Sequence, residues 1–160
     1  MTVRIRRAAP ADAPAITAMI HGLARFERAA DQCTVVETQV STALFSPNPT
    51  LHAHVAEVDG EVAAMALWFL NFSTWDGVDG IYLEDLYVER RFRRFGLARG
   101  LLTALARECA AHNYTRLSWA VLNWNTDAIA LYQAVGAQPQ REWTTYRLSG
   151  SDLAELAGPG

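Results

Sequence analysis

Hydrophobic and polar positions follow one another along this chain in patterns that predict an ordered series of strands and helices. Val3–Arg7 alternates apolar and basic residues, which is typical of a short strand with one solvent-facing side. Apolar residues recur at three- and four-residue spacing from Ile16 to Leu23, which predicts a helix whose N-terminus Asp12 can cap. A weaker helix is expected over Glu37–Phe45, because two prolines follow it closely.

The middle and the end of the chain predict further strands with two helices between them. Asp59-Gly60 separates two apolar runs and is a typical hairpin turn. The predicted strands are His52–Val58 and residues 62–72, 81–88, 115–122 and 143–148, with a turn at residues 77–80 and helices at residues 96–111 and Thr126–Ala134. The order β-α-α-β-β-β-α-β-α-β predicts a mixed α/β fold, with helices packed on one sheet in a single domain over residues 1–160.

Composition places the chain among globular proteins. Of its 160 residues, 51% are hydrophobic and the net charge is only −3, which argues against intrinsic disorder. The longest apolar run, residues 62–70, is shorter than the roughly 20 residues that a membrane-crossing helix needs. Cys33 and Cys109 lie far apart without metal-type spacing, so neither a disulfide framework nor a metal site is expected. We expect a soluble, cytoplasmic protein with no membrane partner and no bound metal.

Charge is divided unevenly along the chain. All 14 basic residues are arginine, yet residues 29–89 contain ten acidic residues and no arginine, and five arginines fall within residues 90–99. This division suggests one region for an anion and another for a cation, although sequence blocks can also mix once the chain is folded. Because the chain as a whole is acidic and one basic loop is a small footprint, nucleic acid is not an expected partner.

The arginine-rich segment contains a glycine where a loop becomes a helix. Unpaired N–H groups at a helix N-terminus carry partial positive charge, and Gly96 together with the small Ala98 lets a phosphate approach the main chain. The sequence therefore predicts a pyrophosphate cradle here, with an ordinary exposed basic loop as the alternative. The segment lacks the Gly-Lys-Ser/Thr ending of a P-loop.

Two adjacent carboxylates interrupt the apolar strand predicted at residues 81–88. Strict alternation puts Glu84 on one face with Tyr82, Leu86 and Val88, and Asp85 on the other face with Ile81, Leu83 and Tyr87. Both faces are otherwise apolar, so at least one carboxylate is expected in a poorly hydrated place. Burial there raises a carboxyl pKa and suits the group to act as a general base. The alternative is a structural acid paired with the backbone or with an arginine.

A third segment leads into the helix predicted at Thr126–Ala134. Asn125 is a good N-cap residue, and Tyr132 falls on the inward stripe of the helix. A phenol at this position could donate a proton to a leaving group, whereas an inward tyrosine is more often part of a core. No G-x-S-x-G motif supports a serine hydrolase.

Together these segments resemble the GNAT superfamily of N-acetyltransferases. The family signature Arg/Gln-x-x-Gly-x-Gly/Ala, which opens a helix after a strand, is matched by Arg93, Gly96 and Ala98, and the element order agrees over nearly the whole chain. A narrower similarity to the spermidine/spermine branch, which includes diamine and thialysine acetyltransferases, rests on Tyr-Leu-Glu-Asp-Leu-Tyr-Val, Arg-Arg-Phe-Gly-Leu-Ala, Asn-Trp-Asn and Arg-Phe-Glu. The resemblance implies a central mixed, mostly antiparallel sheet flanked by helices.

The resemblance also implies roles for individual residues. Acetyl-CoA is the implied co-substrate, with no metal, and a homodimer is the implied assembly. Tyr132 would protonate the departing CoA thiolate, and Glu84 would help to deprotonate the amine. The implied substrate-binding residues are Phe26, Glu27, Glu84 and Trp119, and the implied cofactor-binding residues are Leu86, Tyr87, Val88, Arg93, Arg94, Phe95, Gly96, Leu97, Ala98, Arg99 and Asn125.

The expected function is direct transfer of an acetyl group from acetyl-CoA to a primary amine of a small cationic substrate. Residues 142–145 replace a more acidic stretch of the polyamine enzymes, which leaves diamines and amino acids such as thialysine open beside polyamines. One alternative is acetylation of a protein or peptide, which needs an open groove rather than an acidic pocket. A second alternative is a catalytically silent module that binds acyl-CoA.

Overall fold

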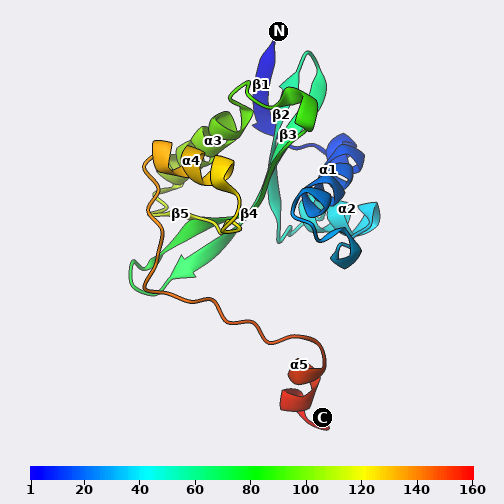
Figure 1. The fold of residues 1–160 in the computed structure, drawn as a ribbon, viewed down its shortest axis with the longest axis vertical. Coiled ribbons are helices and arrows are strands. Elements are labelled where there is room, and N and C mark those ends of the chain that lie inside the picture. Colours follow the sequence, from blue (N-terminus) through cyan, green and yellow to red (C-terminus); the bar gives the residue numbers. More distant parts are fainter. The chain divides into compact units, whose positions relative to one another are not determined.

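A five-stranded sheet in the order β1-β2-β3-β4-β5 forms the centre of the fold (Figure 1). The computed structural model describes residues 1–160 as two units, Met1–Thr126 and Asp127–Gly160, and the sheet belongs to the first. Its strands are β1 Val3–Arg7, β2 His52–Val58, β3 Glu61–Ser73, β4 Val78–Val88 and β5 Leu117–Ser118. The first four pair antiparallel, and β5 runs parallel to β4. The expected mixed, mostly antiparallel sheet is therefore confirmed.

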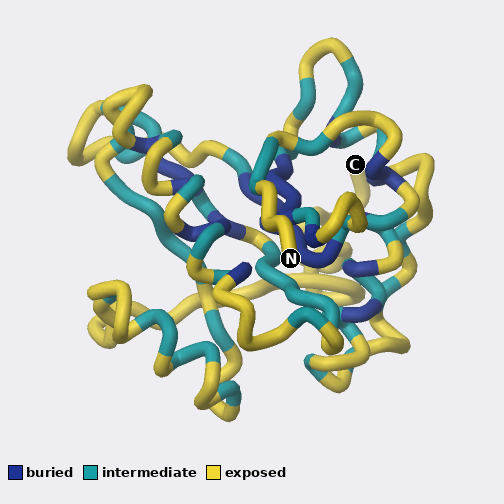
Figure 2. The backbone as a smooth tube through the Cα atoms, turned by 90° about the horizontal axis from the view of Figure 1, so that it is seen from above, coloured by how far each residue is buried: buried dark blue, intermediate teal, exposed yellow.

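Helices cover both faces of this sheet. Figure 1 shows α1 (Ala13–Phe26) and α2 (Glu37–Phe45) on one side and α3 (Leu97–His112) on the other. The core under α1 and α2 consists of Ile16, Met19, Val40, Leu44, Ala53, Val55, Met65 and Leu67. The α3 residues Leu97, Leu101, Leu102 and Leu105 are buried, and a Cβ atom at Gly100 would come within 2.6 Å of the Ile5 side chain. In Figure 2, buried residues form short runs in the elements, and the connections are mostly exposed.

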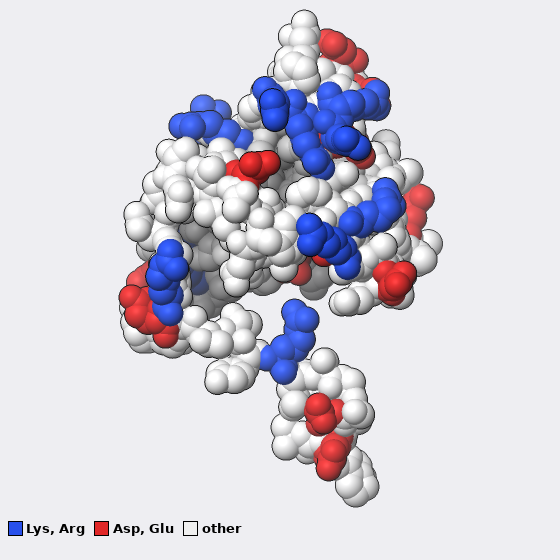
Figure 3. Space-filling view, in the orientation of Figure 1, with Lys and Arg blue, Asp and Glu red and all other residues white.

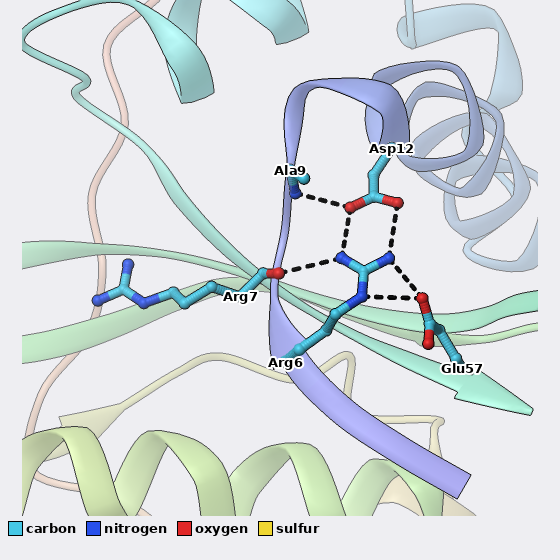
Figure 4. A network of polar contacts seen from close by, with 5 residues as sticks. All are labelled: Arg6, Arg7, Ala9, Asp12 and Glu57. Carbon is cyan, nitrogen blue, oxygen red and sulfur yellow. Dashed lines mark hydrogen bonds and ion pairs between the residues drawn. The ribbon is translucent and has the colours of Figure 1, made fainter. Parts of the chain in front are cut away.

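Asp12 stands at the start of α1, but its carboxylate does not cap the helix. It accepts two hydrogen bonds from the Arg6 guanidinium, at 2.7 and 3.0 Å, and one from the Ala9 backbone N–H at 2.7 Å (Figure 4). Arg6 also donates to Glu57 on β2. The prediction that the Asp12 side chain caps the helix is wrong, because the Arg6 guanidinium donates two charged hydrogen bonds to the same carboxylate oxygens. The bond from Arg6 lowers the pKa of Asp12, so the pair stays ionised.

A β-bulge interrupts the pairing of β3 with β4. Leu67 pairs with Asp85 and Trp68 pairs with Leu83, so Glu84 has no cross-strand partner. Residues directly opposite one another in an antiparallel pair share a face. Asp85 therefore lies on the α1 side with Leu67, whereas Leu83 lies on the α3 side with Trp68. The alternation predicted for residues 81–88 is wrong here, since the extra residue places the side chains before the bulge, such as Leu83, on the opposite face from Asp85 and Tyr87.

The elements after α3 depart most from the sequence prediction. The strand predicted at residues 115–122 is only Leu117–Ser118, and the turn predicted at residues 77–80 is shorter because β4 begins at Val78. The helix α4 (Thr126–Ala134) has the predicted bounds. Residues 143–148 form no strand, and an unpredicted helix, α5 (Gly150–Ala157), follows them. No residue from 127 to 160 is buried, so residues 143–148 have neither a pairing strand nor a core in their own unit.

No helix has the length and apolar character needed to cross a membrane.

Candidate active site

Three carboxylates interact where the end of α1 meets β4. Asp85 is largely buried on the α1 side of the sheet, and Tyr87, which pairs with Met65, lies on the same face. Burial, together with the negative charges of Glu84 and Glu27, raises the pKa of Asp85 to about 6. Glu27 directly follows α1, and burial raises its pKa as well. The structure thus brings together the predicted Glu27 and Glu84 with a third acid.

The sequence predicts that a buried carboxylate on β4 acts as a general base, and Asp85 rather than Glu84 is the carboxylate that fits this description. Its pKa of about 6 leaves it ionised at pH 7 but able to accept a proton, which is the range that suits a general base. Glu84 is exposed at the bulge. The sequence contained both residues, but strict alternation could not tell which of them would be buried. Bulges are common beside active sites because they redirect a side chain in this way.

Aromatic rings and an arginine line the neighbourhood of Glu27. The Phe26 ring lies 5.7 Å from the Trp124 ring, and the Arg93 guanidinium lies 5.0 Å from Phe26 and 5.8 Å from Tyr87. Tyr87 packs closely on α1, since a Cβ atom at Gly22 would come within 2.9 Å of its hydroxyl oxygen. These contacts join the ends of α1 and β4 to the segment before α4. Phe26, which is predicted to bind the substrate, therefore belongs to this cluster. Trp124 belongs to it as well, but sequence spacing alone could not show that Trp124 lies close to Phe26.

The predicted phosphate cradle has open main chain at its glycine. Gly96 is the N-cap residue of α3, with φ of 74° and no capping side chain, and nothing lies within 4 Å of the position that its Cβ would take. Arg94 also has a positive φ, of 69°. The first amides of α3 are therefore not capped by a side chain, as a diphosphate site requires. Arg94, Phe95 and Arg99 are exposed, and Leu97 is buried under the helix. Figure 3 shows basic side chains gathered on the upper part of the face in view.

Arg93 has a different role from its neighbours. Its Nε atom donates a hydrogen bond to the Val88 carbonyl at 3.1 Å, and its guanidinium stacks on Phe26 and Tyr87. This side chain thus fixes the loop to the end of β4. The Arg93 guanidinium is therefore held by contacts within the protein. By contrast, no carboxylate of the protein pairs with the exposed Arg94 and Arg99.

The edge of β4 that faces β5 has no strand partner beyond its first half. The β4–β5 ladder contains only Ile81 with Leu117 and Tyr82 with Ser118. From Leu83 to Val88 no strand pairs with this edge, and the Val88 carbonyl is bound by the Arg93 side chain. The main chain of the predicted residues Leu86, Tyr87 and Val88 lies there, and the loop to Gly96 begins directly after it. An extended ligand arm can add hydrogen bonds to such an edge.

The remaining predicted residues follow β5. Trp119 is half-buried directly after the strand, and Asn125 directly precedes α4, where its N–H donates to the Leu122 carbonyl at 2.9 Å. Tyr132 lies within α4 in the second unit. No group of three or more histidine, cysteine or carboxylate side chains is arranged to hold a metal ion.

The sequence matches a protein-family model over most of its length. Residues 20–137 match the model of the acetyltransferase (GNAT) family. The chain belongs to the GNAT acetyltransferase family. This confirms the stated resemblance and the expected N-acetyltransferase activity, for which the family uses acetyl-CoA as co-substrate. The open main chain at Gly96 and along β4 fits that co-substrate.

Related GNAT proteins include enzymes named for small amines. A thialysine N-epsilon-acetyltransferase of Caenorhabditis elegans is 37% identical over 92% of this chain and 92% of its own length. An L-ornithine N5-acetyltransferase of Arabidopsis thaliana is 30% identical over 98% of this chain and 88% of its own length. An integron cassette protein from the mobile metagenome of V. cholerae has a similar fold, with a TM-score of 0.82 at 25% identity and 99% of both chains covered.

Proposed function

We propose that this acetyltransferase acts on a terminal primary amine of a small cationic substrate, either a diamino acid or a diamine. The carboxylates of Glu27, Glu84 and Asp85 carry the proposal, because together they can attract an ammonium group to a largely buried place. The names of the relatives, which refer to thialysine and ornithine, support the same substrate class. Acetylation of a protein or peptide would need an open groove instead.

The amine must lose a proton before it can attack the acetyl group. An alkylamine with a pKa of about 10.4 is almost wholly protonated at pH 7, and freeing its lone pair costs roughly 3.4 pK units, or about 4.6 kcal/mol. Burial favours Asp85 as the proton acceptor, since its pKa is raised to about 6. The family resemblance favours Glu84, either directly or through water. Glu27 and Phe26 would line the amine pocket, with Trp119 as a further candidate.

The cofactor-binding residues follow the loop and the open strand edge. Acetyl-CoA supplies the activated acetyl thioester. Main-chain groups of Leu86, Tyr87 and Val88 would hold the pantetheine arm and stabilise the oxyanion that forms on attack. The amides that follow Gly96 would hold the diphosphate, helped by the exposed arginines of the loop, and Asn125 would add a further contact. Tyr132 as the proton donor to the CoA thiolate rests on the family resemblance.

The assembly and setting belong to the same proposal. One acetyltransferase domain over residues 1–160 is supported by relatives that align with 92% to 98% of the chain. A homodimer is supported by exposed apolar side chains near the C-terminus, among them Trp143, Tyr146 and Leu156. A cytoplasmic location is supported by two free cysteines and by the acetyl-CoA requirement. The partner is a small molecule rather than nucleic acid or a membrane.

A turnover assay with the purified full chain tests the proposal. Acetyl-CoA is supplied with thialysine, ornithine, lysine, 1,4-diaminobutane, spermidine and short peptides in turn, and the release of free CoA is followed. We expect turnover with at least one diamino acid or diamine and none with peptides that carry a free N-terminus or lysine. Binding of acetyl-CoA without CoA release in any reaction would instead identify a silent acyl-CoA-binding module.

A further inference from the structure

A cavity of about 290 Å³ lies directly after the C-terminal end of α1. Its lining residues come from one short segment and are Arg25, Arg28, Ala29, Ala30, Asp31 and Gln32. Both signs of charge are therefore present, with two guanidinium groups and one carboxylate. The volume leaves room for several water-sized groups. The small side chains of Ala29 and Ala30 also belong to the lining.

Arg28 is held in a defined orientation at this cavity. Its φ of 61° lies in the left-handed region, which is uncommon for a residue other than glycine. Its guanidinium lies 4.4 Å from the centroid of the Trp124 ring, and no carboxylate of the protein pairs with it. Stacking on an aromatic ring restricts the guanidinium while its N–H edges stay available for a two-pronged bond to a carboxylate.

The segment that lines the cavity flanks one carboxylate of the active site in the sequence. Glu27, whose charge acts on Asp85, is the residue directly before Arg28. Phe26 and Arg28 both contact Trp124, at ring and guanidinium distances of 5.7 and 4.4 Å. The protein thus presents carboxylates for an ammonium group and, beside them, a cavity that carries both guanidinium and carboxylate groups.

We propose that this cavity receives the α-ammonium and α-carboxylate head group of a diamino acid, with Arg25 and Arg28 on the carboxylate and Asp31 on the α-ammonium. The side-chain amine of that substrate then extends toward Glu27 and Asp85. A diamine of the same length brings the same second ammonium without the carboxylate that would offset the charge of the two guanidinium groups, so net repulsion remains. This inference rests on the proposed function and narrows its substrate class from diamines and diamino acids to diamino acids.

Matched substrate pairs and matched variants test the proposal. The pairs are ornithine with 1,4-diaminobutane and lysine with 1,5-diaminopentane, which differ only by the carboxylate. The variants are Arg28→Gln and Arg25→Gln, which remove the charge and leave the backbone requirement at position 28 unchanged. Arg107→Gln is the control, because Arg107 is an exposed arginine on α3, which packs on the other side of the sheet from α1.

We expect the parent enzyme to have the lower KM for the amino acid of each pair. Arg28→Gln should raise the KM for ornithine by about tenfold or more, with kcat little changed, because a charged hydrogen bond to the carboxylate is lost. The KM for 1,4-diaminobutane should stay the same or fall. Arg107→Gln should change neither value.

Two results would overturn the head-group proposal while leaving the proposed function standing. One is an equal KM change for ornithine and 1,4-diaminobutane in Arg28→Gln. The other is a raised KM for acetyl-CoA alone, which would assign the cavity to the cofactor. If no amine is acetylated, the proposed function fails, and calorimetric binding of ornithine against 1,4-diaminobutane then decides the head-group proposal by itself.

Discussion

The carboxylates near β4 and the arginines between β4 and α3 carry opposite charges in opposite surroundings. Asp85 is largely buried, and its ionised form is disfavoured by burial and by two neighbouring acids. Arg94 in the loop and Arg99 in the first turn of α3 are exposed, and the main chain at Gly96 is open to solvent. One region therefore holds charge at an energetic cost, whereas the other holds charge where water already stabilises it.

This difference separates two kinds of site. An exposed basic loop with free amides can attract a phosphate without altering the pKa of any group, which suits binding. A buried carboxylate has a shifted pKa, which suits proton transfer but lowers the stability of the fold. Substitutions in the two regions should accordingly affect different quantities, and three predictions use that contrast.

The largest expected effect concerns Asp85→Asn. Loss of a general base typically lowers catalysis by about 10² to 10⁴-fold, and we expect a fall in kcat/KM of that order, measured by CoA release. Glu84→Gln is the matched control, since it removes the neighbouring carboxylate at the exposed bulge position. It should lower kcat/KM much less than Asp85→Asn does. The parent kcat/KM should also fall as the pH drops below about 6, where Asp85 becomes protonated. A larger loss in Glu84→Gln than in Asp85→Asn would assign the base to Glu84.

The second prediction concerns Gly96→Val in the loop. A branched side chain here should crowd the diphosphate and weaken acetyl-CoA binding by about ten- to a hundredfold, measured by calorimetry. Gly77→Val is the control, because Gly77 has a φ of 72° against 74° for Gly96, and both have open space at the Cβ position. Both variants should lose similar stability, about 1–2 kcal/mol or more, from the left-handed backbone. Equal acetyl-CoA affinity in the two variants would contradict the cradle at Gly96.

The smallest expected effect is a gain in stability in Asp85→Asn. The folded pKa of about 6 lies above the ordinary value of 3.8, so the folded state holds a proton that the unfolded chain has lost. This group therefore lowers the unfolding free energy of the parent as pH rises from about 4 to 6, and the deficit persists above pH 6. Asp85→Asn should be more stable than the parent by about 1–3 kcal/mol at pH 7 and by little at pH 4, in urea unfolding. An equal gain in unfolding free energy in Glu84→Gln would argue against burial of Asp85 as the cause of the destabilisation.

Local signals predicted much of this fold. Val3–Arg7, Glu37–Phe45, His52–Val58 and Thr126–Ala134 have the predicted bounds, because residue periodicity and turn residues within a few positions define them. The glycine-containing signature placed Gly96 at the start of a helix for the same reason. Residues 143–148 are rich in residues that favour strands, yet no strand forms, since a strand also needs a partner for its main chain.

The sequence by itself determined the family, the order of most elements and the two charged regions, because these depend on residue type and short-range spacing. Only the tertiary structure decided which carboxylate is buried, that Arg6 occupies the carboxylate of Asp12, and that Arg28 stacks on Trp124. Each of these depends on which distant residues come into contact when β3, β4 and α1 pack together. A one-residue bulge at Glu84 is enough to exchange the faces on which neighbouring side chains lie.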